Sequence, residues 1–160
     1  MPEPIEITKI KENYNNREYV LKVVKEQGAL LDFADESFKD DREIVLAAIE
    51  NNPEALEFAS DRLKADKEIA LLAGKGAGWT ACYFSPELKA DKEVIINAAQ
   101  NDGQVLYFAS EELRDDKDVV MAAVTAKPLI VKYASLRGKI ASVIGILVNI
   151  LLATSKIVVG

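Results

Sequence analysis

Histidine is absent from this chain of 160 residues, and cysteine occurs only once, as Cys82. A single cysteine cannot form a disulfide within the chain, so a reducing compartment such as the cytoplasm is expected. Without histidine, and with no base evident beside Cys82, no side chain stands out as a general base or an activated nucleophile. We therefore expect no catalytic residues, no cofactor and no metal site.

Proline and glycine are also scarce, with five and eight residues, while hydrophobic residues make up 49% of the chain. This composition predicts one folded domain with a substantial core. The formal net charge of −6 argues against nucleic acid as the main ligand. Residues 1–118 hold 15 basic and all 26 acidic residues, a charge of −11, and the remainder carries +5. Such asymmetry either marks a surface for anionic head groups or an acidic partner, or arises by chance in a short tail.

A unit of 25 residues is repeated five times without an insertion. The units begin at Asn16, Asp41, Asp66, Asp91 and Asp116, and the second reads DREIVLAAIENNPEALEFASDRLKA. A strict period of this length predicts stacked helical units, each of which buries its apolar face against its neighbours. We number the positions 1–25 within each unit.

Each unit has the pattern of two helices. The Asp or Asn at position 1 is a helix N-cap, and apolar residues at positions 4, 5, 6, 8 and 9 predict a helix of about 11 residues that is packed between neighbours. Glycine or proline at position 13 ends this helix, and a second helix of about nine residues follows. The second helix carries an aromatic residue at position 18, expected to lie in the core: Phe33, Phe58, Tyr83, Phe108 and Tyr133. The predicted fold is all-α, a right-packed helix-turn-helix solenoid of about five units.

The third unit departs from the others through Gly74, Gly76 and Gly78. Three alternating glycines predict that its first helix ends early and that the turn is flexible. Paired acids at residues 40–41 and 115–116 do not match the spacing of a calcium loop, and one member of each pair is already explained as an N-cap.

The unit resembles a family of short helical repeats of unknown function that occur, often in tandem, in bacterial and protist proteins. The shared features are Asp-Lys-Glu-Val at the start, alanine at position 8, glycine at position 13, then leucine, an aromatic residue, Ala-Ser and a Leu-Lys-Asp close. The resemblance covers about residues 16–135 and is strongest in the units that begin at Asp41, Asp91 and Asp116. It implies an all-helical repeat and brings no catalytic residues, because the family has no established activity.

Positions 14 and 17 vary most between units and are the candidates for specificity. They hold Ala29 and Asp32, Glu54 and Glu57, Trp79 and Cys82, Gln104 and Tyr107, and Leu129 and Lys132. Both positions accept charge and lie three residues apart, so they are expected to face solvent on one side of the second helix. Trp79, Cys82, Tyr107 and Leu129 then form a partly apolar stripe for a protein partner. The alternative is the ordinary scatter of exposed apolar residues.

The last segment, residues 138–160, is predicted to form a hydrophobic helix. Residues 140–153 carry no charge, and residues 140–159 carry only Lys156. A run of 14 is typical of a buried helix, whereas about 20 residues span a bilayer. Its apolar residues are Ile140, Val143, Ile144, Ile146, Leu147, Val148, Ile150, Leu151 and Leu152. Its small residues, which allow close packing against another helix, are Gly138, Ser142, Gly145 and Asn149.

The chain therefore divides into an N-terminal extension (residues 1–15), a repeat domain (16–137) and the C-terminal helix (138–160). The expected function is a non-catalytic protein-interaction or scaffold module, a subunit of a larger assembly. The alternative is a cytoplasmic accessory subunit of a membrane complex, anchored by residues 138–160. That helix either enters the bilayer, packs on another hydrophobic subunit or folds back on the repeats.

Overall fold

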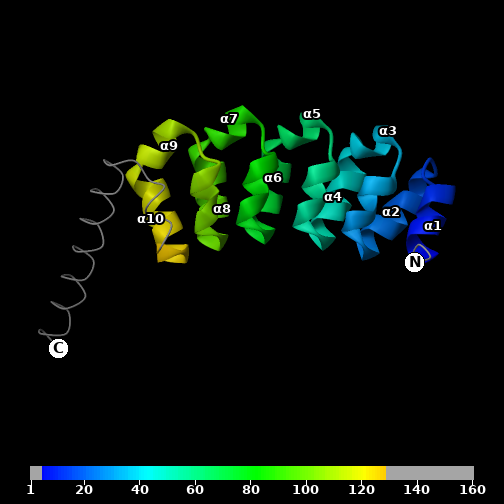
Figure 1. Cartoon of the computed structure of the whole chain (residues 1–160). Coiled ribbons are helices and arrows are strands. Elements are labelled where there is room, and N and C mark those ends of the chain that lie inside the picture. Colours follow the sequence, from blue (N-terminus) through cyan, green and yellow to red (C-terminus); the bar gives the residue numbers. More distant parts are fainter. Residues whose placement is uncertain (1–4, 129–160) are drawn as a thin grey trace, which may run out of the picture.

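The structure, a computed structural model, describes residues 5–128. These residues form helices and no strand, and the units stack in a row that curves into a shallow arc (Figure 1). The predicted all-α repeat solenoid is confirmed. The predicted C-terminal helix, and the part of the fifth unit that begins at residue 129, lie outside the described residues.

Each unit begins with an α-helix of ten residues. These long helices stand side by side in one layer (Figure 1): α2 (Arg17–Glu26), α4 (Arg42–Asn51), α6 (Lys67–Gly76), α8 (Lys92–Asn101) and α10 (Lys117–Ala126). The side chain at position 1 caps each of them, as the sequence predicts. Asp91, for example, accepts hydrogen bonds from the backbone N–H groups of Glu93 and Val94 at 3.0 and 3.2 Å.

The second half of the unit differs from the prediction of one further helix. It consists of a 3₁₀-helix followed by a short α-helix. The 3₁₀-helices are η1 (Gly28–Phe33), η2 (Pro53–Phe58), η3 (Gly78–Tyr83) and η4 (Gly103–Tyr107). The short helices, which follow the upper edge in Figure 1, are α3 (Glu36–Lys39), α5 (Asp61–Lys64), α7 (Pro86–Lys89) and α9 (Glu111–Asp115).

The break between them has a chemical cause at position 20. This position holds Asp35, Ser60, Ser85 or Ser110, and each side chain accepts a hydrogen bond from a backbone N–H two or three residues later. A side chain that caps a new helix ends the preceding one, because the N-cap residue is itself not helical. The helix-turn-helix prediction overlooked this second cap.

The N-terminal extension contributes a helix, α1 (Ile5–Glu12), that packs on η1. Ile10 is fully buried, and the ammonium group of Lys11 lies 5.3 Å from the centre of the Phe33 ring. The backbone N–H of Asp35 donates to the carbonyl of Tyr14 at 3.0 Å. In the next unit, the equivalent bond joins Ser60 to Lys39 at 2.9 Å. The extension therefore covers the second layer of the first unit as a preceding unit would.

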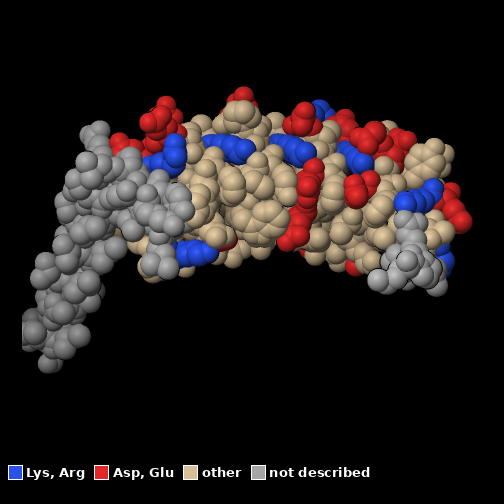
Figure 2. Space-filling model, in the orientation of Figure 1, with Lys and Arg blue, Asp and Glu red and all other residues tan. Residues whose placement is uncertain are grey.

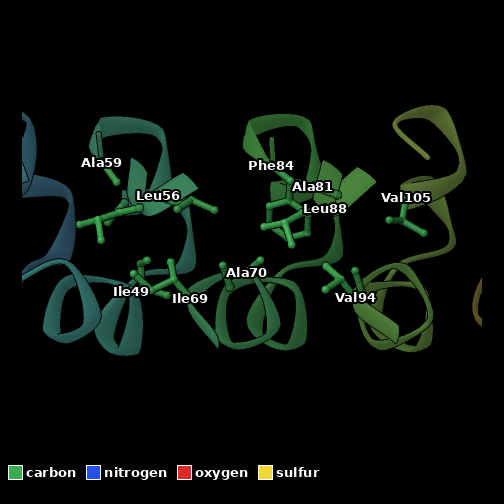
Figure 3. Close-up of a cluster of buried hydrophobic side chains, with 14 of the residues drawn as sticks. Ile49, Leu56, Ala59, Ile69, Ala70, Ala81, Phe84, Leu88, Val94 and Val105 are labelled. Atoms are coloured by element: carbon green, nitrogen blue, oxygen red, sulfur yellow. The ribbon is translucent and has the colours of Figure 1, made fainter. Parts of the chain in front are cut away.

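The hydrophobic core lies between the layer of long helices and the layer of 3₁₀-helices. Figure 3 shows side chains from both layers in this space, among them Ile49, Ile69, Val94, Leu56, Ala81 and Val105, and each of these six is at most 1% exposed. The aromatic residues at position 18 lie at the margin of the core, where Phe58, Tyr83 and Phe108 are only partly buried. Residues three apart share a face of a 3₁₀-helix, so positions 16 and 19 face the core together and position 18 does not.

The glycines of the third unit do not shorten its first helix. Helix α6 has ten residues, like the other long helices, and no glycine among residues 5–128 has a positive φ. A Cβ atom on Gly76 would lie 2.3 Å from Pro53, and one on Gly78 would lie 2.5 Å from the carbonyl oxygen of Ala98. These glycines are required by the close approach of neighbouring units, and the prediction that the first helix of this unit ends early is wrong.

Charged side chains connect the starts of successive long helices. The cation at position 2 of one unit pairs with the acids at positions 1 and 3 of the next. Arg17 contacts Asp41 and Glu43 at 2.8 and 2.6 Å. The other members of this ion-pair ladder are Arg42 with Asp66 and Glu68, Lys67 with Asp91 and Glu93, and Lys92 with Asp116 and Asp118. The aspartates at position 1 therefore cap their own helix and bind the preceding unit.

The opposite ends of the long helices are joined by position 11. Asn51 accepts a hydrogen bond from the N–H of Gly28 at 2.8 Å and donates to the carbonyls of Lys25 and Glu26. Asn101 likewise donates to the carbonyl of Lys75 at 2.8 Å. These asparagines satisfy backbone groups at the C-terminal end of the preceding helix.

Candidate functional site

Positions 14 and 17 lie on the 3₁₀-helices of the second layer. A 3₁₀-helix has three residues per turn, so these two positions project from the same side. Helices η3 and η4 are neighbours, which places Trp79 and Cys82 beside Gln104 and Tyr107. Tyr107 is 43% exposed, whereas Trp79 and Cys82 are half-buried. We call these four residues of η3 and η4 the aromatic surface.

Trp79 is held in place by Tyr83. The two rings meet edge to face, with their centres 5.9 Å apart. The hydroxyl of Tyr83 donates to Glu57 of the preceding unit at 3.0 Å. Burial and this hydrogen bond raise the pKa of Tyr83 to about 12, so the hydroxyl remains a donor at neutral pH.

Cys82 lies one turn of η3 after Trp79. The ammonium group of Lys89 donates to the backbone carbonyl of Cys82 at 2.7 Å, which connects α7 to the end of η3. Burial raises the pKa of the Cys82 thiol. The thiol is therefore protonated at neutral pH and is suited to packing rather than to nucleophilic chemistry.

Tyr107 is the most exposed member of the aromatic surface. Its ring lies 6.2 Å from that of Phe108, which packs against the core. Leu129, the fourth residue of the predicted stripe, lies outside the described residues. Of the predicted set, the structure thus brings Trp79, Cys82 and Tyr107 together on adjacent helices.

Three of the four residues at the same positions of the first two units are acidic. Asp32, Glu54 and Glu57 are exposed there on η1 and η2. Figure 2 shows a face on which Lys and Arg form a row across the units, with uncharged surface below this row in the region of α6 and α8. Positions 14 and 17 therefore change from mainly acidic residues in the first two units to a set that includes aromatic residues in the third and fourth units.

Two residues that support the aromatic surface were not predicted from the sequence. The repeat position of Tyr83 predicts a core residue, and no motif singles out Lys89. The hydrogen bond from Tyr83 to Glu57 joins position 18 of one unit to position 17 of the preceding unit. Only the arrangement of the units shows which of these positions meet, although the change from Phe to Tyr at this position was a signal of a new polar contact.

The paired acids at residues 40–41 are both engaged by their surroundings. Asp40 accepts hydrogen bonds from the hydroxyl of Ser60 and from Arg62, and Asp41 caps α4 and pairs with Arg17. These contacts lower the pKa of both carboxyl groups. Within residues 5–128, no group of three or more Cys, Asp or Glu side chains is placed to hold a metal ion.

The predicted C-terminal helix lies outside the described residues. This applies to its apolar residues, within 140–152, and to its small residues Gly138, Ser142, Gly145 and Asn149. In the part of the chain that the structure describes, no helix is both long and apolar enough to cross a membrane.

Comparison with protein families gives three tandem matches to one family, the domain of unknown function DUF4116. The matches cover residues 16–62, 41–89 and 91–137, and each spans nearly two of the 25-residue units. The chain belongs to this family. No curated protein and no solved structure matches the chain. Membership of DUF4116 confirms the predicted short-repeat family of unknown function.

Proposed function

We propose that this DUF4116 protein is a non-catalytic interaction module that holds a protein partner on its aromatic surface, as a scaffold or subunit of a larger assembly. The observation that carries the proposal is the exposure of Tyr107, at 43%, next to the half-buried Trp79 and Cys82. Tryptophan and tyrosine are enriched among residues that dominate binding energy at protein interfaces. Solenoids commonly bind partners through rows of such variable positions on adjacent units.

A non-catalytic role is supported by the state of the reactive groups. The chain has no histidine, and burial raises the pKa of its only thiol. The acids at position 1 of units two to five act as helix caps and ion-pair partners. None of these groups has the arrangement of a nucleophile beside a base.

The partner class is supported by charge and by shape. A net charge of −6 disfavours nucleic acid, whose phosphates require a basic surface. The aromatic surface is a line of side chains on two helices, and such a line suits a protein segment. The single cysteine supports a cytoplasmic, reducing location.

A second candidate function is favoured by the composition of the C-terminal segment. Residues 140–153 are uncharged and follow the cations Lys132, Arg137 and Lys139. This pattern supports an accessory subunit of a membrane complex that is anchored by residues 138–160, with its solenoid in the cytoplasm. Flotation with liposomes of the full chain, but not of a chain ending at residue 137, is the expected result for such an anchor.

The aromatic surface is tested by the double variant Trp79→Ala/Tyr107→Ala, with Tyr14→Ala as the matched control. Tyr14 is the other strongly exposed aromatic residue among those described, at 46%, and it lies at the far end of the solenoid. Quantitative affinity capture from the source cells is expected to lose partners about tenfold or more with the double variant only. Equal capture by all three proteins would contradict the proposal, and a large fall in the melting temperature would assign both residues to the core.

A further inference from the structure

The layer of long helices has an open face at its first member, α2. In the later units, positions 4 and 8 pack against the long helix of the preceding unit. The eight residues at these positions are all 0% exposed: Ile44, Ile69, Val94, Val119, Ala48, Ala73, Ala98 and Ala123. Their counterparts in the first unit, Tyr19 and Val23, are only half-buried. Helix α1 packs on η1 and touches α2, and it leaves Tyr19 and Val23 partly exposed.

A groove of about 460 Å³ remains where a preceding long helix would lie. Tyr19, Val23 and the buried Leu30 form its apolar wall, and Lys9 of α1 and Lys22 of α2 contribute two cationic side chains. Glu26 lies at the C-terminal end of α2 and also lines the groove. The groove belongs to the first unit, whereas the aromatic surface belongs to the third and fourth units.

The residues in this groove do not suit another copy of the repeat. Position 8 is alanine in the four later units and valine in the first, so a helix cannot approach α2 as closely. Position 11 is Asn51 or Asn101 where it donates hydrogen bonds to the C-terminal carbonyls of the preceding helix. Glu26 occupies position 11 in the first unit, and an ionised carboxylate cannot donate. It would repel the negative C-terminal end of a helix that runs parallel to α2.

A helix that runs in the opposite direction meets Glu26 with its positive N-terminal end. Its free backbone N–H groups are then available to the Glu26 carboxylate. The two lysines favour acidic side chains along the flank of such a helix. We propose that this groove binds an amphipathic helix of a partner protein, antiparallel to α2, with acidic residues beside its apolar face.

The test is selection from a phage-displayed library of amphipathic helical peptides of about 20 residues, with the positions beside the apolar face randomised, against the full chain. Recovered peptides are synthesised, and their affinities are measured by fluorescence anisotropy. The expected binders carry Asp or Glu beside the apolar face. They are expected to bind Lys9→Glu/Lys22→Glu about tenfold more weakly, because two attractions become repulsions. Lys25→Glu is the matched control, since Lys25 is an exposed lysine of α2 that does not line the groove.

The direction of the bound helix is tested with a nitroxide at either end of the peptide. An N-terminal label is expected to broaden the NMR signals of Glu26 and Gln27, and a C-terminal label those of Asn16 and Arg17. Recovery of no binders, binders with basic flanks, or binding that is equal in the charge-reversed chain would overturn the proposal. Binders that depend on Trp79 and Tyr107 instead would support the proposed function and also overturn the helix groove.

Discussion

Two substitutions at Asp91 separate its role as a helix cap from its role in the ion-pair ladder. Asp91 accepts hydrogen bonds from two backbone N–H groups of α8 and pairs with Lys67 at 2.8 Å. Asp91→Ala removes both contacts, whereas Asp91→Asn retains an oxygen that caps the helix and removes only the charge. The chain itself contains this alternative, because Asn16 caps α2 through its side chain.

The cap is expected to contribute the larger share of the stability. Loss of an N-cap costs about 1 kcal/mol, up to about 2 in folded proteins. The ion pair adds less, because the side chain of Asp91 is 28% exposed and that of Lys67 is 43% exposed. In a chain of this size, 1 kcal/mol corresponds to a shift of about 3 °C in the melting temperature. We expect Asp91→Ala to lower it by about 3–6 °C and Asp91→Asn by no more than about 2 °C.

Urea and thermal unfolding of the full chain, followed by circular dichroism at 222 nm, measure these differences. In 1 M salt, the small difference between wild type and Asp91→Asn is expected to vanish, while the difference between Asn and Ala persists. Equal losses in the two variants would refute the capping argument and assign the effect to charge. An Asp91→Ala chain as stable as wild type would refute a stabilising role for both the N-cap and the ion pair.

The pH dependence has a definite sign. The hydrogen bond from Lys67 is the main cause that lowers the pKa of Asp91 below its ordinary value of 3.8. A lowered pKa in the folded state means that the stabilisation is fully present above the unfolded value. It is lost as the pH falls through the lower folded value. The advantage of wild type over Asp91→Asn is therefore constant near neutral pH and disappears only in acid below about pH 4.

Three further outcomes are expected. Gly103→Ala should destabilise the chain in urea, although alanine normally favours helices, because the new Cβ would lie 2.2 Å from the carbonyl oxygen of Ala123; a stabilised variant would contradict the close contact. Leu56→Ala, at a site 1% exposed, should cost about 2–5 kcal/mol of unfolding free energy, and a loss below about 1 kcal/mol would place Leu56 outside the core. Absorbance titration of the tyrosines should lose a component near pH 12 when Tyr83 is replaced in Tyr83→Phe, whereas an unchanged curve would exclude Tyr83 as its source.

The sequence was sufficient to predict the unit, its first helix and the family. The period of 25 residues and the Asp at position 1 are local signals, and the structure bears them out in each unit from Asp41 onward. The second half of the unit was misread because Ser60 and its equivalents were treated as ordinary helix residues rather than as N-caps. That signal was present in the sequence, since Ser and Asp are among the strongest capping residues.

The sequence pattern does not predict the contacts between units. Gly76 and Gly78 suggest flexibility when they are read alone, and only the positions of Pro53 and Ala98 show that there is no space for a side chain. The face shared by Trp79, Cys82 and Tyr107 followed from their spacing. The bond between Tyr83 and Glu57 did not, because it depends on how far one unit is displaced along the next.

The pairing of position 13 with position 11 of the following unit implies that the units are not interchangeable. Gly28 offers an N–H to Asn51, whereas Pro53 has none and faces Gly76. Removal of one unit, residues 41–65, would bring Gly28 opposite Gly76. The N–H of Gly28 would then lack the side-chain amide acceptor that Asn51 provides. Removal of two units, residues 41–90, would bring Gly28 opposite Asn101, whose side-chain amide could again accept a hydrogen bond from the N–H of Gly28. Deletion of residues 41–90 is therefore expected to be tolerated better than deletion of residues 41–65, because the tolerance of a deletion depends on which residues it brings face to face.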